Sequence, residues 1–526
     1  MPLTTSDAGS EPVHDRPVLP VPENPLKGES VALERIEAVG TAEAVRQQAA
    51  RPRQGLALAL LVACAFMLNM DSAIVEVALP SIRADFGLAL RGTSWVANSY
   101  ILAFGGFLLL GGRLGDLFGR RRVFVYGLAL FAVASLVGGM SSSPGALIGA
   151  RVGQGLAAAV VAPSVLSLLI TVFPDEGPEA RLRRNKALSI MGALSAGGGS
   201  AGYFLGGTLT DVWGWQSTFL VNVPIAAGAA LAAVRFLPET RPGLGGKMNI
   251  AGALAISVGM TGVVYVFVDA NKAGWTSPPT LFLSVLSLGI LVGFFVAQKR
   301  SAEPLIPLRL FRSRVLRGAN TVAALINMAI GPVILFVSFY VQDVLDYSAL
   351  AAGLAIMPIV LTVTVSSTMT GWLLRHVSKR ALMNTGLAMF ACGLAWMSQM
   401  SGGTYWAELL GPECLVGFGG GLVFVTFTVS GTSDLDERDA GLASGVLTTS
   451  QKIGASFGLA VLITLADGRT ERSLAGGALS SREALTAGYQ SAILAAIVPV
   501  LLAMVAATVW VPGRRQDRAR TEAFPA

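Results

Sequence analysis

The sequence has few of the residues on which enzymes and metal proteins rely. Its 526 residues include three cysteines and two histidines. The cysteines lie in apolar stretches without a paired spacing, and the histidines lie far apart in the chain. This pattern excludes a zinc site, a disulfide framework and a Cys/His nucleophile, so neither a metal nor an enzyme is predicted. The five residues are Cys64, Cys392, Cys414, His14 and His376.

Charge is scarce as well, and this scarcity decides the class of protein. Charged residues make up 13% of the chain and hydrophobic residues 53%, whereas about 25% of the residues of a soluble domain are charged. The composition therefore predicts an integral membrane protein. The formal net charge of +7 does not indicate a nucleic-acid partner, because the basic residues lie in loops between apolar runs, where they set membrane topology.

The chain also lacks the parts that other modes of action need. It has no nucleotide-binding loop of the Walker type and no polar segment long enough for a soluble catalytic or sensory domain. A membrane-embedded enzyme or sensor is therefore excluded, and any energy that the chain uses must come from an ion gradient, with no cofactor. Residues 1–54 are polar and repeatedly interrupted by proline, which predicts a disordered cytoplasmic tail and not a signal peptide.

Apolar runs fill most of the remaining chain. A helix needs about 20 apolar residues to cross the hydrocarbon of a bilayer, and fourteen segments reach this length. The sequence therefore predicts fourteen transmembrane helices. Their limits are 55–78, 93–112, 122–140, 144–173, 187–209, 216–236, 250–269, 279–298, 317–341, 352–374, 381–400, 406–430, 442–465 and 489–511.

A glycine-punctuated, charged turn joins the second and third predicted spans. Residues 112–121 follow the spacing G-x-L-x-D-x-x-G-R-R, and this turn resembles the loop between helices 2 and 3 of the major facilitator superfamily of secondary transporters. The resemblance implies a conformational latch, in which Asp116 approaches the cytoplasmic end of span 13 when the transporter faces outward, where the helix dipole favours a carboxylate. The latch residues are Gly112, Asp116, Gly119, Arg120 and Arg121.

Other segments resemble one branch of that superfamily, the fourteen-helix drug:proton antiporters of the actinobacterial multidrug and antibiotic efflux type. Residues 68–80 resemble the signature of the first helix in that branch. The resemblance implies an all-α major facilitator fold, with two six-helix bundles and two inserted helices. Four more segments share it: Ser94-Trp95-Val96 with Tyr100 and Leu102, Arg151-x2-Gln154-Gly155, Asn222-Val223-Pro224, and 441–445.

Internal repeats support the same division of the chain. Leu68-Asn69-Met70 recurs as Ile326-Asn327-Met328, and Arg151-x3-Gly155 aligns with Glu413-x3-Gly417. Repeats with a binding site at their interface are typical of secondary transporters. The predicted domains are a tail at 1–54, a six-helix bundle at 55–240, inserted helices 7 and 8 at 241–300, a second six-helix bundle at 301–511, and a cytoplasmic tail at 512–526.

Four places depart from the pattern of the antiporter branch. Glu76 stands where that branch usually has Asn, Tyr203 replaces a proline of the fifth-helix motif, and Lys452 belongs to a Gln-Lys pair in place of Arg-Gln. The fourth is Trp215-Gln216-Ser217, which replaces Trp-Arg-Trp. Because the motif with the proline is associated with export, its loss leaves the direction of transport open. The motif's glycines still permit close helix packing; they are Gly198, Gly202, Gly206 and Gly207.

Asp71 and Arg151 are the leading candidates for a functional pair, because an ionisable residue inside a span is costly and is usually functional. Asp71 lies ~24 Å along the first span from Gly55, and Arg151 lies ~10 Å from the opposite face on a helix that runs the other way. In a slab ~30 Å thick the two share one depth and can pair. The pair can exchange its partners for a proton or a cationic substrate, or it can be a static structural ion pair.

Three further charges lie within predicted spans. Glu413 takes the repeat position of Arg151, and its alternative role is a structural hydrogen bond to the backbone. Glu76 is about 140° around the helix from Asp71, so both a binding role and a solvated position at the rim are open. Lys452 can pair with Glu413, contact an anionic group of the substrate, or extend its ammonium toward the interface.

The resemblance implies proton-coupled export of amphiphilic drugs or antibiotics across the cytoplasmic membrane, which confers resistance or self-resistance. The expected partners are the lipid bilayer, a small amphiphilic substrate and the proton, and the expected state is a monomer. The preference for protons over sodium rests on the resemblance. The alternative is a narrow metabolite exporter or a proton-linked uptake symporter of the same fold. The expected walls of the substrate cavity are Trp95, Tyr100, Gln154 and Tyr203.

We predict that both termini are cytoplasmic. Basic residues outside residues 1–50, other than Arg151 and Lys452, number 27 on the side of Arg120–Arg122 and six on the other, and cytoplasmic loops carry the excess. Green fluorescent protein fused to either end should therefore fluoresce, and alkaline phosphatase fused there should be inactive. A fusion within residues 141–143 should give the reverse pattern. Termini on opposite sides would contradict the even number of spans.

Overall fold

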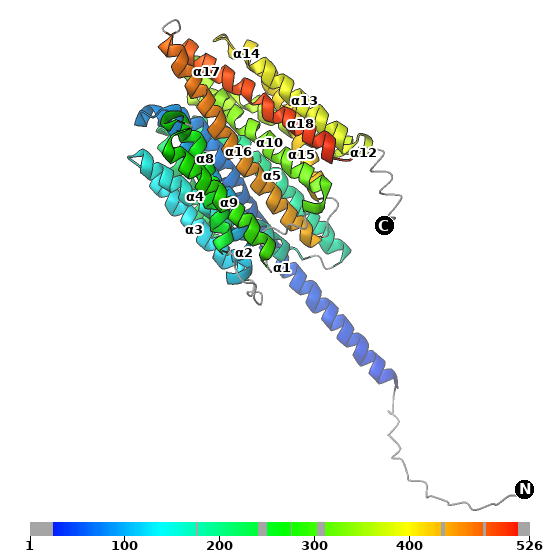
Figure 1. Cartoon of the computed structure of the whole chain (residues 1–526). Helices are drawn as coiled ribbons and strands as arrows, with labels where there is room; N and C mark the ends of the chain where they lie inside the picture. The colour runs from blue at the N-terminus through cyan, green and yellow to red at the C-terminus, as the bar shows by residue number, and fades with distance from the viewer. Residues whose placement is uncertain are drawn as a thin grey trace, which may run out of the picture. The chain divides into compact units, whose positions relative to one another are not determined.

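The structure is a computed structural model of the chain. It describes residues 25–174, 177–239, 250–274, 276–301, 311–432, 437–476 and 480–513. The chain divides into two compact units, Met1–Gly55 and Leu56–Ala526. All regular elements in the described residues are helical, and within the second unit the long helices lie side by side (Figure 1).

The first helix begins earlier than predicted. Helix α1 spans Pro25–Phe86, so part of the tail that the sequence analysis expects to be disordered is helical. The reason is local, because residues 29–50 are rich in Ala, Glu, Arg and Gln, which are strong helix formers. Most of the C-terminal tail, from residue 514, lies outside the described residues.

Helices α1 to α7 form what we call the first bundle. Helix α4 packs between α2 and α3, and α7 packs against α3. Gly119 joins α2 to α3 with a φ of 94°, a conformation that glycine adopts without steric cost. The remaining bounds are α2 (Leu90–Phe118), α3 (Arg120–Gly139), α4 (Pro144–Val172), α5 (Pro178–Trp213), α6 (Gln216–Leu220) and α7 (Asn222–Phe236).

Two helices lie between the bundles in sequence. Helix α8 (Ile250–Ala273) and helix α9 (Pro278–Arg300) pack against each other, and α8 also packs against α2 and α16. Because α2 and α16 belong to different bundles, α8 covers the line along which those two helices meet.

Helices α10 to α18 form the second bundle. Its main contacts join α10 to α16, α13 to α15 and α12 to α15. The bounds are α10 (Arg314–Phe339), the π-helical turn η2 (Tyr340–Val344), α11 (Ala349–Ala355), α12 (Met357–His376), α13 (Lys379–Met397), α14 (Tyr405–Glu408), α15 (Leu410–Thr432), α16 (Glu437–Ala475), α17 (Ser481–Ala495) and α18 (Ile497–Trp510).

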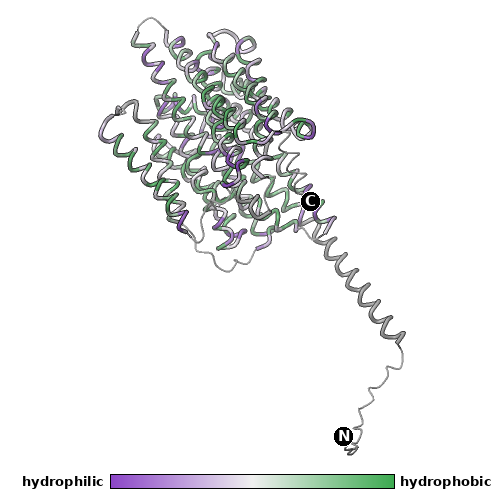
Figure 2. Tube along the Cα trace, turned by 45° about the vertical axis from the view of Figure 1, so that its right-hand side comes forward, coloured by the Kyte–Doolittle hydropathy of each residue, from purple (hydrophilic) through white to green (hydrophobic). Residues whose placement is uncertain are grey.

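Ten helices among the described residues are long and apolar enough to cross a membrane, or eleven if bent α2 is one span. Hydrophobic residues run along these helices (Figure 2). The three other predicted spans coincide with α5, α8 and α13. The all-α membrane architecture is confirmed, while the count of fourteen spans stays a prediction.

Ion pairs and hydrogen bonds join the two bundles at one end of the second unit. We call it the Arg83 end, where α1 ends, and we call the opposite end, where α3 begins, the Arg120 end. Arg83 pairs with Asp343 at 2.8 Å, and Arg91 pairs with Asp467 at 2.6 Å. The carboxylate of Asp211 also accepts hydrogen bonds from the first two amides of α11, each at 3.0 Å. These contacts close the Arg83 end.

Glycines on α16 allow it to approach α10 closely. A methyl group at Gly454 would contact the carbonyl oxygen of Ala324, and one at Gly458 would contact that of Met328. Small residues allow helix backbones in a membrane to come close enough for dense packing. The glycines therefore set the separation of the two long helices that hold the second bundle together.

We predict that Gly454→Ala lowers the melting temperature of the detergent-purified protein. The added methyl group meets backbone that cannot move aside, and overpacking costs about 1–3 kcal/mol. Gly331→Ala on α10 is the matched control, because its methyl group would lie 4.0 Å from Ala455, an ordinary contact distance. Equal melting temperatures for both variants would show that the close approach of α10 and α16 does not limit stability.

Candidate functional site

Asp71 lies at the centre of the first bundle and accepts three hydrogen bonds. Its Oδ2 accepts from Arg151 Nη1 at 2.9 Å. Its Oδ1 accepts from Gln154 Nε2 at 3.0 Å and from Asn222 Nδ2 at 2.8 Å. The side chain is 0% exposed. Both carboxylate oxygens therefore have the partners that a buried charge requires.

Arg151 also has several interaction partners that fix its position. Its Nε donates to the carbonyl oxygen of Val96 at 3.1 Å, and its Nη1 also donates to Gln154 at 2.9 Å. The guanidinium carbon lies 4.2 Å from the ring centroid of Tyr100 and 6.0 Å from that of Phe219, distances at which an aromatic ring attracts a cation. Hydrogen bonds and ring faces thus fix the orientation of the guanidinium.

The sequence analysis anticipated only part of this network. It placed Asp71 and Arg151 at one depth, and the structure brings them into contact. It did not assign a site role to Asn222, although an amide in an apolar helix is a signal that could have identified it. Ser135, which accepts from Gln154 at 2.9 Å, resembles any other serine in a span, so only the structure reveals its part.

Glu76, Tyr203 and Lys452 form a second group of polar residues. Tyr203 on α5 donates a hydrogen bond from its hydroxyl to Glu76 Oε2 on α1 at 2.9 Å. Lys452 is supplied by α16 of the second bundle, and its ammonium lies beside the ring of Phe104 on α2. These are three of the four places at which the sequence departs from the antiporter pattern. The fourth lies apart from them, at the Arg83 end, where Trp215 binds Asp85.

A cavity of about 150 Å³ lies next to this group. Helices α1, α2, α4 and α5 of the first bundle and α16 of the second contribute to its walls. The lining contains one charged side chain, that of Lys452. The lining residues are Ala65, Leu68, Asn69, Ser72, Phe104, Ala162, Val165, Leu166, Met191, Ser195 and Lys452.

The four residues expected to line the substrate cavity lie elsewhere in this conformation. Tyr100 and Gln154 belong to the network around Asp71, and Tyr203 binds Glu76. The ring of Trp95 lies 6.0 Å from that of Tyr265 on the inserted helix α8. The 150 Å³ cavity is therefore lined by other residues of the same helices.

Glu413 lies apart from the other candidates, in the second bundle. It is 0% exposed, and its Oε2 lies 3.0 Å from the hydroxyl of Tyr405, which lies 2.9 Å from the carbonyl oxygen of Ala355. A hydroxyl has one proton and can donate to only one of these acceptors. Both contacts are hydrogen bonds only if Glu413 is protonated and donates to Tyr405. Lys452 contacts Phe104 instead of Glu413.

The latch residues lie at the Arg120 end. Arg120 binds Asp116 at 3.3 Å and also donates to the hydroxyl of Thr171 at 3.1 Å. Arg121 pairs with Glu239 at 3.3 Å. Asp116 is 51% exposed, and Gly112 lies beside Pro163 of α4. Since the latch is expected to act in the outward-facing state, its role stays a prediction.

The glycines of the fifth-helix motif lie where α5 approaches other helices closely. A methyl group at Gly202 or Gly206 would lie 2.7 Å from a carbonyl oxygen of α1, and one at Gly198 would lie 2.5 Å from another. Gly207 instead faces Ala349 of α11 in the second bundle. The motif therefore brings α5 against both bundles.

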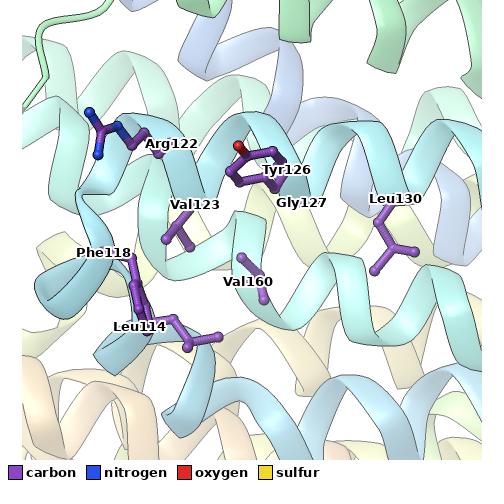
Figure 3. A pocket seen from close by; sticks show the side chains of 8 residues that line it. All are labelled: Leu114, Phe118, Arg122, Val123, Tyr126, Gly127, Leu130 and Val160. Carbon is purple, nitrogen blue, oxygen red and sulfur yellow. The ribbon is translucent and has the colours of Figure 1, made fainter.

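A larger hollow lies on the outer side of the first bundle, away from these charges. It has a volume of about 530 Å³ and lies between α2, α3 and α4 (Figure 3). Tyr126 in its lining is 74% exposed, and Arg122 is the only charged lining residue. An open, apolar groove on a membrane protein suits hydrocarbon chains of lipid, so its greater volume does not make it the transport site. The lining residues are Leu114, Phe118, Arg122, Val123, Tyr126, Gly127, Leu130 and Val160.

Comparisons with known proteins identify relatives of this chain. The model of the Major Facilitator Superfamily matches residues 61–459. The cephamycin export protein CmcT of Amycolatopsis lactamdurans is 40% identical over 459 residues, which cover 86% of this chain and 93% of that protein. The puromycin resistance protein pur8 of Streptomyces alboniger is 34% identical, over 90% of this chain and 94% of that protein.

A solved structure has the same fold. It is a bacterial homologue of the human lysosomal transporter Spinster in an inward-facing and occupied conformation. The TM-score is 0.63 at 13% sequence identity, over 87% of this chain and 97% of that one. At this identity the likeness concerns the fold alone.

We predict that Arg151→Met destabilises the protein more than Arg151→Met combined with Asp71→Asn does. The single variant leaves a buried carboxylate without its cation, which costs about 3–5 kcal/mol, whereas the double variant removes both charges. Thermal unfolding of both proteins in one detergent measures the difference. A double variant that melts no higher than the single variant would show that the two charges do not compensate each other.

Proposed function

Because the chain belongs to the major facilitator superfamily, we propose that it exports an amphiphilic drug or antibiotic in exchange for protons. Relatives that cover most of the chain support this, since their names describe export of cephamycin and resistance to puromycin. The observation that carries the proton coupling is the buried Asp71–Arg151 pair, in which a carboxylate without exposed surface has one guanidinium as its counter-ion.

The proposed role of Asp71 follows from the two opposing effects on a buried carboxylate. Burial favours its protonated form, and a neighbouring guanidinium favours its charged form. The contact with Arg151, here at 2.9 Å, favours the anion of Asp71. If a rearrangement within the first bundle moves Arg151 away, Asp71 takes up a proton, and it releases that proton when Arg151 returns.

Glu413 is the second candidate for the proton-binding group. The double contact of Tyr405 fits a protonated Glu413, so we propose that this carboxyl carries a proton in the present conformation. Its Oε1 has no hydrogen-bond partner among the described residues, and a charge there would be poorly compensated. Glu76 is the third candidate, held by Tyr203.

We further propose that the Arg120 end is cytoplasmic and that this conformation faces inward. The contacts that close the Arg83 end support this, as does the position of the cavity between them and the Arg120 end. In this arrangement both termini are cytoplasmic, and the domains divide at 55–240, 241–300 and 301–511. We propose that the protein acts as a monomer in the cell membrane.

A narrow specificity is the second candidate function. The cavity of about 150 Å³ is smaller than the roughly 300–1,000 Å³ of pockets that hold drug-sized ligands. The size favours a small native metabolite unless the walls move apart when substrate binds. Uptake in place of export remains the other alternative, because Tyr203 replaces the proline of the export motif.

We predict that Asp71→Asn abolishes transport driven by ΔpH in everted membrane vesicles and preserves downhill counterflow. The amide cannot carry a proton, but it can still accept a hydrogen bond from Arg151. Transport of a panel of antibiotics is measured without a protonophore for the ΔpH-driven activity, and with a protonophore for downhill counterflow. Asp85→Asn is the control, because Asp85 binds Trp215 at the Arg83 end and lies outside the buried pair.

If Asp71→Asn transports against a gradient at the wild-type rate and responds to ΔpH as the wild type does, the assignment of the proton to Asp71 is contradicted. Glu413→Gln is then the next variant to test. If both substitutions leave coupling intact, Glu76 or sodium becomes the better explanation.

A further inference from the structure

Among the described residues, Lys452 is the one charged side chain in the lining of the 150 Å³ cavity. Its ammonium lies 4.9 Å from the ring centroid of Phe104. Within the part of the chain that the structure describes, no carboxylate lies within 4 Å of it. A charged side chain inside a membrane span is costly and is usually functional, so we expect this cation to bind an anionic partner.

The side chain has little freedom to leave the cavity. Its Cβ packs against α2 at Gly105, where a methyl group would lie 2.7 Å from it. The ring of Phe104 on the same helix attracts the ammonium from one side. The absence of a side chain at Gly105 thus leaves room for the aliphatic part of Lys452, and the ring of Phe104 holds the ammonium beside the cavity.

The carboxylate whose charge acts on Lys452 is Glu76, but its position is set by another residue. Tyr203 holds Glu76 by a hydrogen bond of 2.9 Å within the first bundle. Lys452 belongs to the second bundle, and no direct ion pair joins it to Glu76 among the described residues. An anion inside the cavity can approach Lys452 more closely than Glu76 does.

We propose that the transported amphiphile carries a carboxylate group and that Lys452 is its counter-ion in the cavity. The remaining lining suits such a molecule, because Asn69, Ser72 and Ser195 are neutral polar groups and the other walls are apolar. Among the described residues none in the lining is acidic, so a cationic amphiphile meets only repulsion from Lys452. The assignment rests on the proposed function and names the substrate class for it.

Glu76 has a defined part in this arrangement. Its charge competes with that of the substrate for Lys452, and it helps to keep the cation compensated when the cavity is empty. Removal of this charge by Glu76→Gln should therefore strengthen binding of the anion and leave binding of a neutral analogue unchanged. Such a selective change is one that a purely structural role of Glu76 would not produce.

The test uses the full-length protein in lipid nanodiscs and three fluorescent probes. They are dansylated undecanoic acid, its methyl ester and dansylated undecylamine, which differ mainly in charge. The wild-type protein should bind the acid about tenfold more tightly than the ester, which corresponds to about 1.4 kcal/mol, and should bind the amine most weakly. Lys452→Gln should remove this preference, and Lys452→Arg should retain it.

Lys186→Gln is the matched control, because it removes an exposed lysine of α5 and should leave all three affinities unchanged. Melting temperatures establish that each variant is folded. Equal binding of the acid and the ester by the wild-type protein would overturn the proposal. A preference for the acid that survives Lys452→Gln would overturn it as well.

A transport experiment separates this inference from the proposed function. Everted vesicles with an imposed ΔpH are given the three probes. Export of the ester or the amine without a preference for the acid would refute the role of Lys452 and leave proton-driven export standing. A binding preference for the acid without ΔpH-driven movement of any probe would refute the proposed function and support the anion site.

Discussion

The ion pair between Asp71 and Arg151 is the interaction on which the first bundle depends. Two charges in a low-dielectric interior lose several kcal/mol of hydration each, and they regain it only through good geometry and further hydrogen bonds. Gln154 and Asn222 supply these bonds to the carboxylate, and the carbonyl of Val96 supplies one to the guanidinium. The network therefore fixes helices α1, α2, α4 and α7 relative to one another.

The group of Glu76, Tyr203 and Lys452 is subject to the same cost of burying charge, but its residues come from both bundles. Around Asp71 every partner comes from the first bundle, so the pair can stay intact while the bundles move. Lys452 comes from the second bundle and faces Glu76 and Tyr203 of the first, so their separation changes with any rocking motion. Coupled transport needs one site for the proton and one for the substrate. The ion pair within the first bundle can hold the proton, and the group between the bundles can bind the substrate.

Close helix packing makes such a motion a discrete step. Gly202 and Gly206 hold α5 against α1, and Gly207 touches α11 of the other bundle. Backbones that pack this closely slide or separate as rigid bodies, because there is no side chain between them to adjust. The salt bridge from Arg83 to Asp343 closes the Arg83 end in the present state, and it must break when that end opens.

The sequence by itself determined the membrane class, the helical fold and the depth of Asp71 and Arg151, because hydropathy and helical rise are local properties that tertiary contacts do not alter. It did not reveal that residues before Gly55 are helical, nor that Asn222 and Ser135 belong to the buried network. Only the tertiary structure placed Glu76, Tyr203 and Lys452 together, and only it separated Lys452 from Glu413. The physical reason is that rotation about each helix axis is set by packing against neighbouring helices, and a linear pattern does not specify which faces of distant helices meet.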